Sequence, residues 1–393
     1  MLASGDWNRA ALLRGYQNAM EIAAREVRCT SLPSDLVGTY YRNGHARFTG
    51  YDGETVAHHF DADGMVTAVT LDGRTGIAVV RQRYVATTEA IAERQAGRRL
   101  YPGIFGNSMP LWAGGAAVKN LANTAVLYHG EQLLALWEGS RPYLLDPLSL
   151  ATRHEWNVDG LIGRTLADSF SAHPRPTTSG LCNFASTSSP LTGQTTVRCW
   201  DFARDGFSLQ APPAVRTLDG HGLYHDFLVT DSWYIFVAPP ARWSSAGSPM
   251  RSVRGVLEWA RGQRPLTSMV EFDEALPTVA HFIRRRPVAS DSAASSPAAS
   301  SSTVHATPTT PAAGTRVADL QTISVELDTF FCFHHANAFE DPTGRHVTFH
   351  TAHIEAGGLP RFDQLKREDE VSTPNPEHSA SAAPLRLSLG PPQ

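Results

Sequence analysis

Short strand-turn-strand patterns recur along most of this chain, and they constrain its fold more than any other feature. Short apolar runs alternate with Gly, Pro, Asp and Asn from about residue 30 onward, whereas helical spacing is found before it. Four stretches have the pattern of β-hairpins: residues 67–86, 123–139, 224–240 and 328–354. The pattern predicts an all-β fold.

The chain has 393 residues, which is too long for a single small β-sandwich. A β-propeller is the most economical all-β architecture, although no repeat of fixed period is visible. We expect a short helical segment over residues 1–30 and a propeller domain over 31–365. An Ala/Ser/Thr/Pro-rich disordered insertion is expected at 289–314, and a disordered tail at 366–393.

Charge and cysteine content exclude several classes of protein. The net charge is -4 and basic residues form no block, so nucleic acid is not an expected partner. The four cysteines form no C-x-x-C pair and are expected to be reduced thiols. No apolar stretch approaches the roughly 18 residues of a membrane-spanning helix. We expect a soluble chain of the cell interior, in cytoplasm or a plastid, or one peripheral to a membrane.

Three of the sixteen histidines lie in or beside apolar stretches with distinctive neighbours: His173 in SFSAHPRP, His225 in GLYHDFLV and His334 in FFCFHHANAFED. Each alone could be a hydrogen-bonded core histidine. They are too far apart in sequence for a local metal motif. A propeller can nevertheless bring them together, because each blade can direct one inner residue to a common axis. Imidazoles at such an axis would suit Fe, Zn or Cu.

Other motifs favour ordinary structure. His346, His350 and His353 in RHVTFHTAHIE are closely spaced, but we expect a solvated strand face there. The segment HHFDADG at residues 58–64 has the acidic spacing of a calcium loop without its distal Glu, and a turn between strands is the better interpretation. Neither a nucleophile elbow nor a dinucleotide fingerprint appears in a suitable context.

The histidine segments, with others in the same order, resemble the carotenoid cleavage oxygenases, most closely those that form retinal. The resemblance spans about residues 32–341, and it is carried by LPSDLVGTYYRNG, HHFDADGMVTAV, KNLANTAVLYHGEQLLALWEGSRPYLLDPLSLAT, SAHPRP, YHDFLVTDSWYIF and FCFHHANAFED. It implies a seven-bladed β-propeller with Fe(2+) held on its axis by four histidines.

The resemblance also implies roles for particular residues. His173, His225 and His334 match three of the iron ligands. Glu138 matches a glutamate that hydrogen-bonds a ligand imidazole, although a solvated carboxylate at a strand end is the alternative. Trp137 and Phe333 match aromatics that line the substrate tunnel, with core packing as an equal alternative.

The match fails near the C-terminus. The segments that carry the fourth histidine and the remaining glutamates are missing, so the propeller is expected to be incomplete, lacking its last blade or blades. His378 has no strand context and is not expected to be a ligand. An unclosed propeller would expose sheet edges and apolar faces.

The expected activity is iron-dependent cleavage by O2 of a conjugated C=C bond in a carotenoid or apocarotenoid, which gives two carbonyl products such as retinal. The alternative is an inactive or truncated member that binds a carotenoid or retinoid. Because such substrates dissolve in lipid, peripheral membrane contact is expected at the tunnel mouth.

Overall fold

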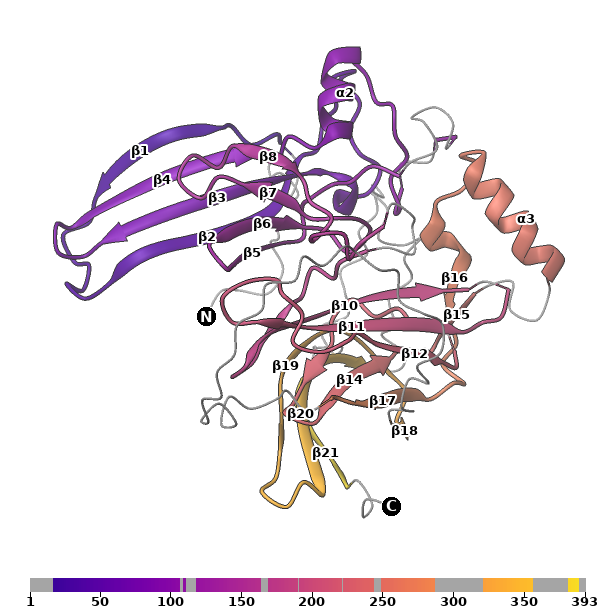
Figure 1. Cartoon of the computed structure of the whole chain (residues 1–393). Helices are drawn as coiled ribbons and strands as arrows, with labels where there is room; N and C mark the ends of the chain where they lie inside the picture. Colours follow the sequence, from indigo (N-terminus) through magenta and orange to yellow (C-terminus); the bar gives the residue numbers. More distant parts are fainter. Residues whose placement is uncertain are drawn as a thin grey trace, which may run out of the picture.

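A computed structural model of the chain is almost entirely β-structure (Figure 1), which confirms the predicted class. It describes residues 17–106, 109–110, 118–163, 169–189, 191–220, 222–243, 249–286, 321–355 and 381–388. Within these residues the helices are few and short: η1 (His59–Asp61), α2 (Thr88–Ala96), α3 (Pro249–Ala260) and η3 (Leu266–Met269).

Five antiparallel sheets follow one another along the chain. Sheet 1 comprises β1 (Ile22–Arg28), β2 (Val37–Arg47), β3 (Asp63–Asp72) and β4 (Ile77–Tyr84). Sheet 2 comprises β5 (Ala125–His129), β6 (Gln132–Leu136), β7 (Tyr143–Leu145) and β8 (Thr152–Glu155). Sheet 3 comprises β9 (Arg175–Pro176), β10 (Gly180–Ser188), β11 (Thr195–Ala203) and β12 (Ala214–Leu218).

Sheet 4 comprises β13 (Leu228–Val229), β14 (Trp233–Ala238), β17 (Thr278–Arg284) and β18 (Thr322–Leu327). Sheet 5 comprises β19 (Phe330–Glu340), β20 (His346–Glu355) and β21 (Ser381–Ser388). A small two-stranded sheet of β15 (Ala241–Trp243) and β16 (Val270–Phe272) flanks α3.

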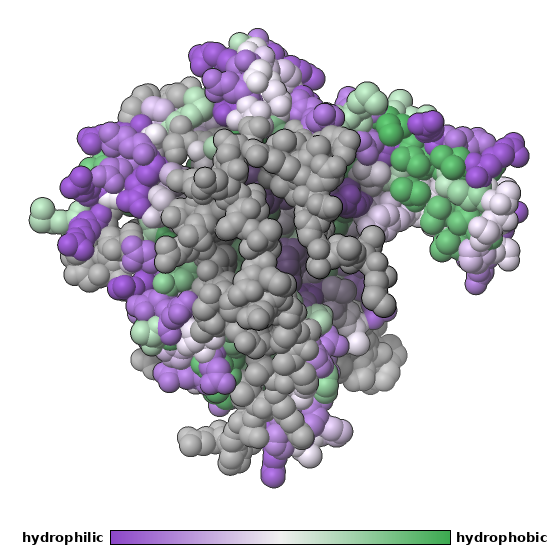
Figure 2. Space-filling view, turned by 180° about the vertical axis from the view of Figure 1, so that it is seen from behind, coloured by the Kyte–Doolittle hydropathy of each residue, from purple (hydrophilic) through white to green (hydrophobic). Residues whose placement is uncertain are grey.

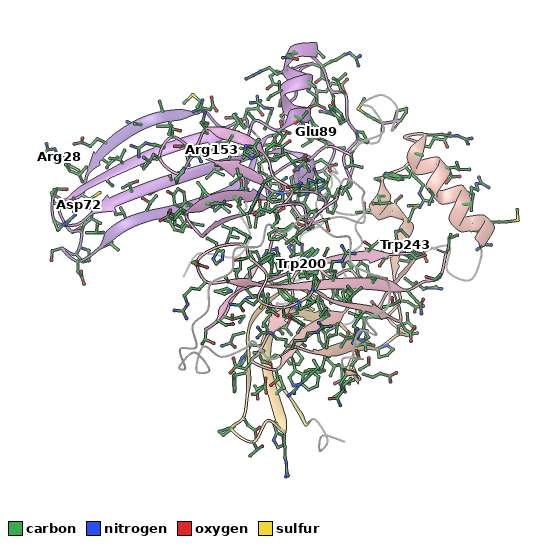
Figure 3. The ribbon with its side chains drawn as sticks, viewed as in Figure 1. Arg28, Asp72, Glu89, Arg153, Trp200 and Trp243 are labelled. Atoms are coloured by element: carbon green, nitrogen blue, oxygen red, sulfur yellow. The ribbon has the colours of Figure 1, made fainter. Side chains whose placement is uncertain are left out.

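Each sheet packs face to face on the next through its own apolar core. In β6, Leu133 and Ala135 face sheet 1 while Leu134 and Leu136 face sheet 3, because successive side chains of a strand point to opposite faces. The strands of sheet 4 likewise contribute to one core with sheet 3 and another with sheet 5. Figure 3 shows Trp200, a buried member of the core between sheets 2 and 3, in the middle of the molecule.

The four predicted hairpins are present: β3–β4, β5–β6, β13–β14 and β19–β20. The tightest of them joins β5 to β6 through Gly130 and Glu131, both with positive φ (53° and 60°). This conformation matches the twist of the flanking strands, and glycine adopts it without strain.

Two sequence predictions are wrong for the described residues. The helix expected over residues 1–30 is a strand at Ile22–Arg28, because β1 hydrogen-bonds the free edge of β4. The loose tail expected from residue 366 includes β21, which pairs with β20 along its whole length. In both segments a partner strand far away in sequence overrides the local pattern. The insertion predicted at 289–314 lies outside the described residues.

Sheet 1 differs from the others because one of its faces is uncovered in the described part of the chain. Its inner face packs on sheet 2, where Tyr41 stacks on Tyr128 and donates a hydrogen bond to the Pro147 carbonyl. By the register of the strands, Tyr40, Val69 and Val80 share the opposite face, and Tyr40 is 62% exposed. Figure 2, seen from behind, shows apolar atoms along this sheet at the right of the picture.

The described cysteines are free thiols, as expected; Cys182, Cys199 and Cys332 are buried. Among the described residues, every helix is too short or too polar to cross a membrane.

Candidate metal centre

The structure brings His173, His225 and His334 together from three consecutive sheets. His173 lies two residues before β9, His225 lies three residues before β13, and His334 lies within β19. One ring nitrogen of each imidazole lies within 4.8 Å of those of the other two. In the part of the chain that the structure describes, no other three His, Cys, Asp or Glu side chains form such a group.

The three rings are arranged around a common point. The Nε2 atoms of His173 and His225 are 2.8 Å apart, and the ring centroids of the three pairs are 4.4, 5.0 and 5.0 Å apart. All three pairs meet edge to face, so the rings are inclined to one another instead of being stacked. Convergent imidazole nitrogens are a donor set suited to Fe, Zn or Cu, and they fit a transition-metal ion.

Glu138 supports one of these imidazoles. It follows β6 of sheet 2, and its Oε1 lies 2.8 Å from Nδ1 of His225. A carboxylate at this distance accepts the Nδ1 proton, which leaves Nε2 of His225 with its lone pair toward the other two rings. Glu138 thus lies beside one of the three imidazoles, and four consecutive sheets each contribute one side chain to the centre.

The electrostatics of the centre differ between its imidazoles. Burial lowers the pKa of His173 to about 4, and the neighbouring His225 acts in the same direction. Partial burial also lowers the pKa of His334, although this imidazole is the most exposed of the three. Burial alone would lower the pKa of His225, but the Glu138 carboxylate outweighs it and raises that pKa. His173 and His334 are therefore neutral at neutral pH, which is the form that binds metals.

An irregularity in β19 directs His334 into the centre. The pairing of β19 with β20 shifts register between Cys332 and His335, which is a β-bulge. A bulge inserts a residue and turns the local side chains. His335 points the other way, as expected: it is buried, and its Nδ1 lies 2.8 Å from Oγ1 of Thr351.

The two predicted tunnel aromatics have different surroundings. The ring of Phe333 lies 5.3 Å from that of His225 and 6.3 Å from that of His334, next to the centre. Trp137 adjoins Glu138 in sequence but is buried, with its ring against Gly139. Phe333 thus lies beside the imidazoles of the centre, whereas Trp137 is buried against Gly139.

Two of the closely spaced histidines of β20 and the acidic segment at residues 58–64 have hydrogen-bond partners of their own. His346 bonds Asp341, and His350 bonds Asn337, each through Nδ1 at 3.0 Å. The acidic segment forms the short helix η1, where Asp61 accepts backbone N–H groups from Ile104, Phe105 and Gly106. A carboxylate occupied in this way anchors a loop.

Sequence reasoning missed two features, one beside the centre and one on the outside of the molecule. The first is an ion pair between Arg175 and Asp226; its signal was a charged residue within two positions of each of two candidate ligands. The second is α3, whose exposed apolar residues Met250, Val253 and Leu257 recur at helical spacing.

Comparison with known proteins gives a consistent result. The family model described as retinal pigment epithelial membrane protein matches residues 16–391. The apocarotenoid-15,15'-oxygenase of Synechocystis is 34% identical over 246 residues, which are 59% of this chain and 47% of that protein. Resveratrol cleavage oxygenase 1 of Chaetomium globosum is 29% identical over 231 residues, 54% of this chain and 35% of that protein.

Solved structures agree with the family match. A tryptophan variant of the Synechocystis apocarotenoid oxygenase has a TM-score of 0.72 at 26% identity, over 95% of this chain and 69% of that one. The cobalt-substituted form of the same Synechocystis oxygenase has a TM-score of 0.71 at 25% identity, over 95% of this chain and 69% of that one. The cobalt form indicates a metal site in that relative.

The fold and the site thus define a β-protein of the carotenoid oxygenase class. The chain belongs to the retinal pigment epithelial membrane protein family, which includes the carotenoid cleavage oxygenases. It spans between about a third and a half of the length of the curated relatives it matches.

Proposed function

We propose that this chain provides the metal centre of an oxygenase that uses Fe(2+) and O2 to cleave a conjugated C=C bond in a carotenoid or apocarotenoid. The observation that carries the proposal is the convergence of His173, His225 and His334 from three separate sheets. Convergence of residues so far apart in sequence has no evident structural purpose unless they share a ligand. The cobalt-substituted relative supports a metal as that ligand.

The residues of the chain have distinct roles in this proposal. The three histidines would hold Fe(2+), which supplies the oxygen chemistry when bound. Glu138 holds the Nδ1 proton of His225 and so keeps Nε2 free to coordinate. Phe333 provides an apolar wall beside the metal ligands. Trp137, the other proposed tunnel aromatic, is buried with its ring against Gly139. No side-chain acid or base is needed for the reaction.

The substrate class follows from the relatives and from the surroundings of the centre. Matching relatives are named for apocarotenoid and for carotenoid cleavage, and others for resveratrol and lignostilbene. Aromatic walls beside the imidazoles suit an extended apolar polyene. We therefore propose an apocarotenoid substrate cut to two carbonyl products, one of them retinal.

The seven-bladed propeller is also a proposal. Five sheets follow one another along the chain, and four of them, sheets 2 to 5, each direct one side chain toward one point; this supports a radial arrangement. The exposed apolar face of sheet 1 in the described residues supports the expectation that the propeller lacks its last blade or blades.

Metal analysis and product analysis test this function together. Purified protein should contain one iron per chain, and His225→Ala should lose it; His350→Ala, which changes a histidine of β20 bonded to Asn337, should keep it. With an apocarotenal and O2, the wild-type protein should form two carbonyl products. Iron-free protein that retains a polyene without cleaving it would support the binding-protein alternative instead.

We also propose that α3 is the membrane contact. A series of rings leads away from the centre toward it: Phe333 lies 4.6 Å from Phe331, which lies 5.1 Å from Phe272 of β16. The neighbouring strand β15 carries Trp243, which packs with Trp259 of α3. This path connects the centre with a helix on the outside of the molecule (Figure 1).

The outer surface of α3 suits an anionic lipid surface. Met250 is 85% exposed, Val253 51% and Leu257 46%. Arginines at 251, 254, 261 and 264 surround them, against a single acid, Glu258. Apolar side chains beside cationic ones are the composition of helices that lie in the membrane interface.

Liposome co-sedimentation tests this contact. Vesicles of phosphatidylcholine with 30% phosphatidylserine should retain the wild-type chain, and Val253→Asp with Leu257→Asp should release it. Leu148→Asp changes another exposed leucine far from α3 and should leave binding intact. Equal binding of all three proteins would refute the assignment.

A further inference from the structure

Each of the three imidazole-bearing segments has a neighbouring residue in one hydrogen-bonded group. Arg175 lies two residues after His173, Asp226 follows His225, and His335 follows His334. The Arg175 guanidinium pairs with Oδ2 of Asp226 and donates to the His335 carbonyl at 2.8 Å. Oδ2 of Asp226 also accepts the His335 N–H at 3.0 Å. The ion pair therefore holds both backbone polar groups of His335.

The same pair also fixes the segment that contains His225. Oδ1 of Asp226 accepts the N–H of Phe227 at 2.7 Å, and Nε of Arg175 donates to the Phe227 carbonyl at 2.9 Å. One arginine and one aspartate thus connect the starts of β9 and β13 with the middle of β19. These strands belong to sheets 3, 4 and 5, so no backbone ladder in the described residues joins them.

The burial of the pair indicates what it does. The Asp226 side chain is 2% exposed and that of Arg175 is 23% exposed. A buried ion pair gains little net stability because desolvation offsets most of the attraction. Its geometry, however, is narrow, since the planar guanidinium makes several hydrogen bonds in fixed directions. Such a pair is better suited to setting positions than to stabilising the fold.

We propose that Arg175 and Asp226 are positioning residues that set the separation of the three imidazoles by joining their backbone segments. This inference rests on the proposal that His173, His225 and His334 share one metal ion. Neither residue contacts the metal in this scheme. Loss of either one lets sheets 3, 4 and 5 shift against one another, and the three nitrogens no longer suit a single ion.

The position of Thr351 completes this arrangement on β19. Its hydroxyl donates to the His334 carbonyl at 3.2 Å and lies 2.8 Å from Nδ1 of His335. The bulge that carries His334 is thereby held from both sides, by Thr351 of β20 and by the ion pair. The position of His334 depends on both contacts, because a bulge has fewer ladder hydrogen bonds of its own.

Titration of the full-length, metal-free chain with Co²⁺ tests the inference, since Co²⁺ bound to imidazoles absorbs visible light. Asp226→Asn and Arg175→Met should weaken Co²⁺ binding about 10- to 100-fold, the range found when partners of metal ligands are removed. Their visible spectra should also change. Arg175→Lys keeps the charge but loses the fork, and should lie between wild type and Arg175→Met.

A second buried ion pair, whose hydrogen bonds go to residues outside the imidazole-bearing segments, provides the control. Arg285 and Asp201 are 2.8 Å apart with both side chains about 5% exposed or less. Asp201→Asn should lower the melting temperature of the metal-free protein while the folded protein keeps wild-type Co²⁺ affinity and spectrum. If Asp226→Asn behaves in the same way, its role is only structural and the inference is wrong.

Two further proteins separate this inference from the proposed function. Wild-type Co²⁺ binding that is lost in His225→Ala establishes the metal centre, and unchanged binding in the Arg175 and Asp226 variants would then refute the positioning role alone. If the wild-type chain binds no Co²⁺, both the metal centre and the positioning role are refuted.

Discussion

Sheets 3 and 4 differ from sheet 1 in how many of their faces are covered, although all three are built from the same kind of strand. In sheets 3 and 4 both faces are covered, and buried polar contacts such as Arg175–Asp226 link one sheet to the next. In the described residues, sheet 1 packs on sheet 2 through one face and presents exposed apolar side chains on the other. The comparison teaches that His173 and His225 come from sheets enclosed on both faces, where packing holds side chains firmly. His334 of sheet 5 depends instead on the bulge, Thr351 and the ion pair.

Truncation of an aromatic residue should give the largest difference between the two regions. Phe236 of sheet 4 is fully buried between Phe184 and Tyr224. Phe236→Ala should cost about 3–5 kcal/mol of unfolding free energy because it leaves a cavity. Tyr40→Ala on the uncovered face should cost less than about 0.5 kcal/mol. Chemical denaturation measures both, and similar losses would show that sheet 1 is covered in solution.

The two regions should also respond oppositely to pH. Burial raises the pKa of Glu89, on α2 above sheet 1 (Figure 3), to about 7. The native state therefore keeps the Glu89 carboxyl protonated up to about pH 7, whereas the unfolded chain releases this proton near pH 4.5. Stability from this group is lost as pH rises through that range, by at most about 3 kcal/mol. Glu89→Gln should remove this loss in urea titrations between pH 5 and 7.5.

His281 of sheet 4 is the counterpart. It is buried, and burial lowers its pKa to about 4. Its contribution to stability is present above about pH 6.5 and is lost as pH falls toward 4, because the unfolded chain takes up the proton first. His281→Gln should flatten the fall in stability between about pH 6.5 and 4, whereas Glu89→Gln should flatten a fall of opposite sign, which develops as pH rises from about 4.5 to 7. If both substitutions changed the pH dependence of the unfolding free energy in the same direction, the two regions would not respond oppositely to pH.

Removal of the Glu138 carboxylate should have a smaller effect, confined to the centre. Glu138→Gln replaces an acceptor that holds the His225 Nδ1 proton, and metal affinity should fall about 10- to 100-fold. Asp72→Asn changes a carboxylate at the far tip of sheet 1 (Figure 3) and should leave affinity unchanged. Iron or Co²⁺ titration distinguishes the two variants. Undiminished affinity in Glu138→Gln would remove this residue from the metal centre.

The smallest effect is expected on the uncovered face itself. Val27 is 41% exposed and, by register with Ala78, shares the face of Tyr40. The double change Val27→Lys and Tyr40→Lys should alter unfolding free energy by less than about 0.5 kcal/mol. Exposed apolar patches promote association, so sedimentation velocity should show less self-association than in wild type. Val215→Lys, on β12, serves as the control, and a large loss of stability in the double variant would argue against an open face.

The hairpins could be predicted because their causes are local. Turn residues such as Gly130 and runs such as WYIFVA specify strand and turn within a few residues. The metal-centre histidines could be identified through their neighbours and the family resemblance. The strand at Ile22–Arg28 could not, because its helical pattern is outweighed by pairing with β4. The bulge that directs His334 depends equally on the register of β20.

The sequence by itself determined the class of fold and four hairpins, since each depends on residues close together in the chain. The three histidines are singled out by their neighbours and by the family resemblance. The tertiary structure alone decided which groups meet: Glu138 with His225, Arg175 with Asp226 and His335, and the ring path from Phe333 toward α3. The physical reason is that contacts between sheets depend on how apolar faces pack, and residues adjacent in space there are distant in sequence.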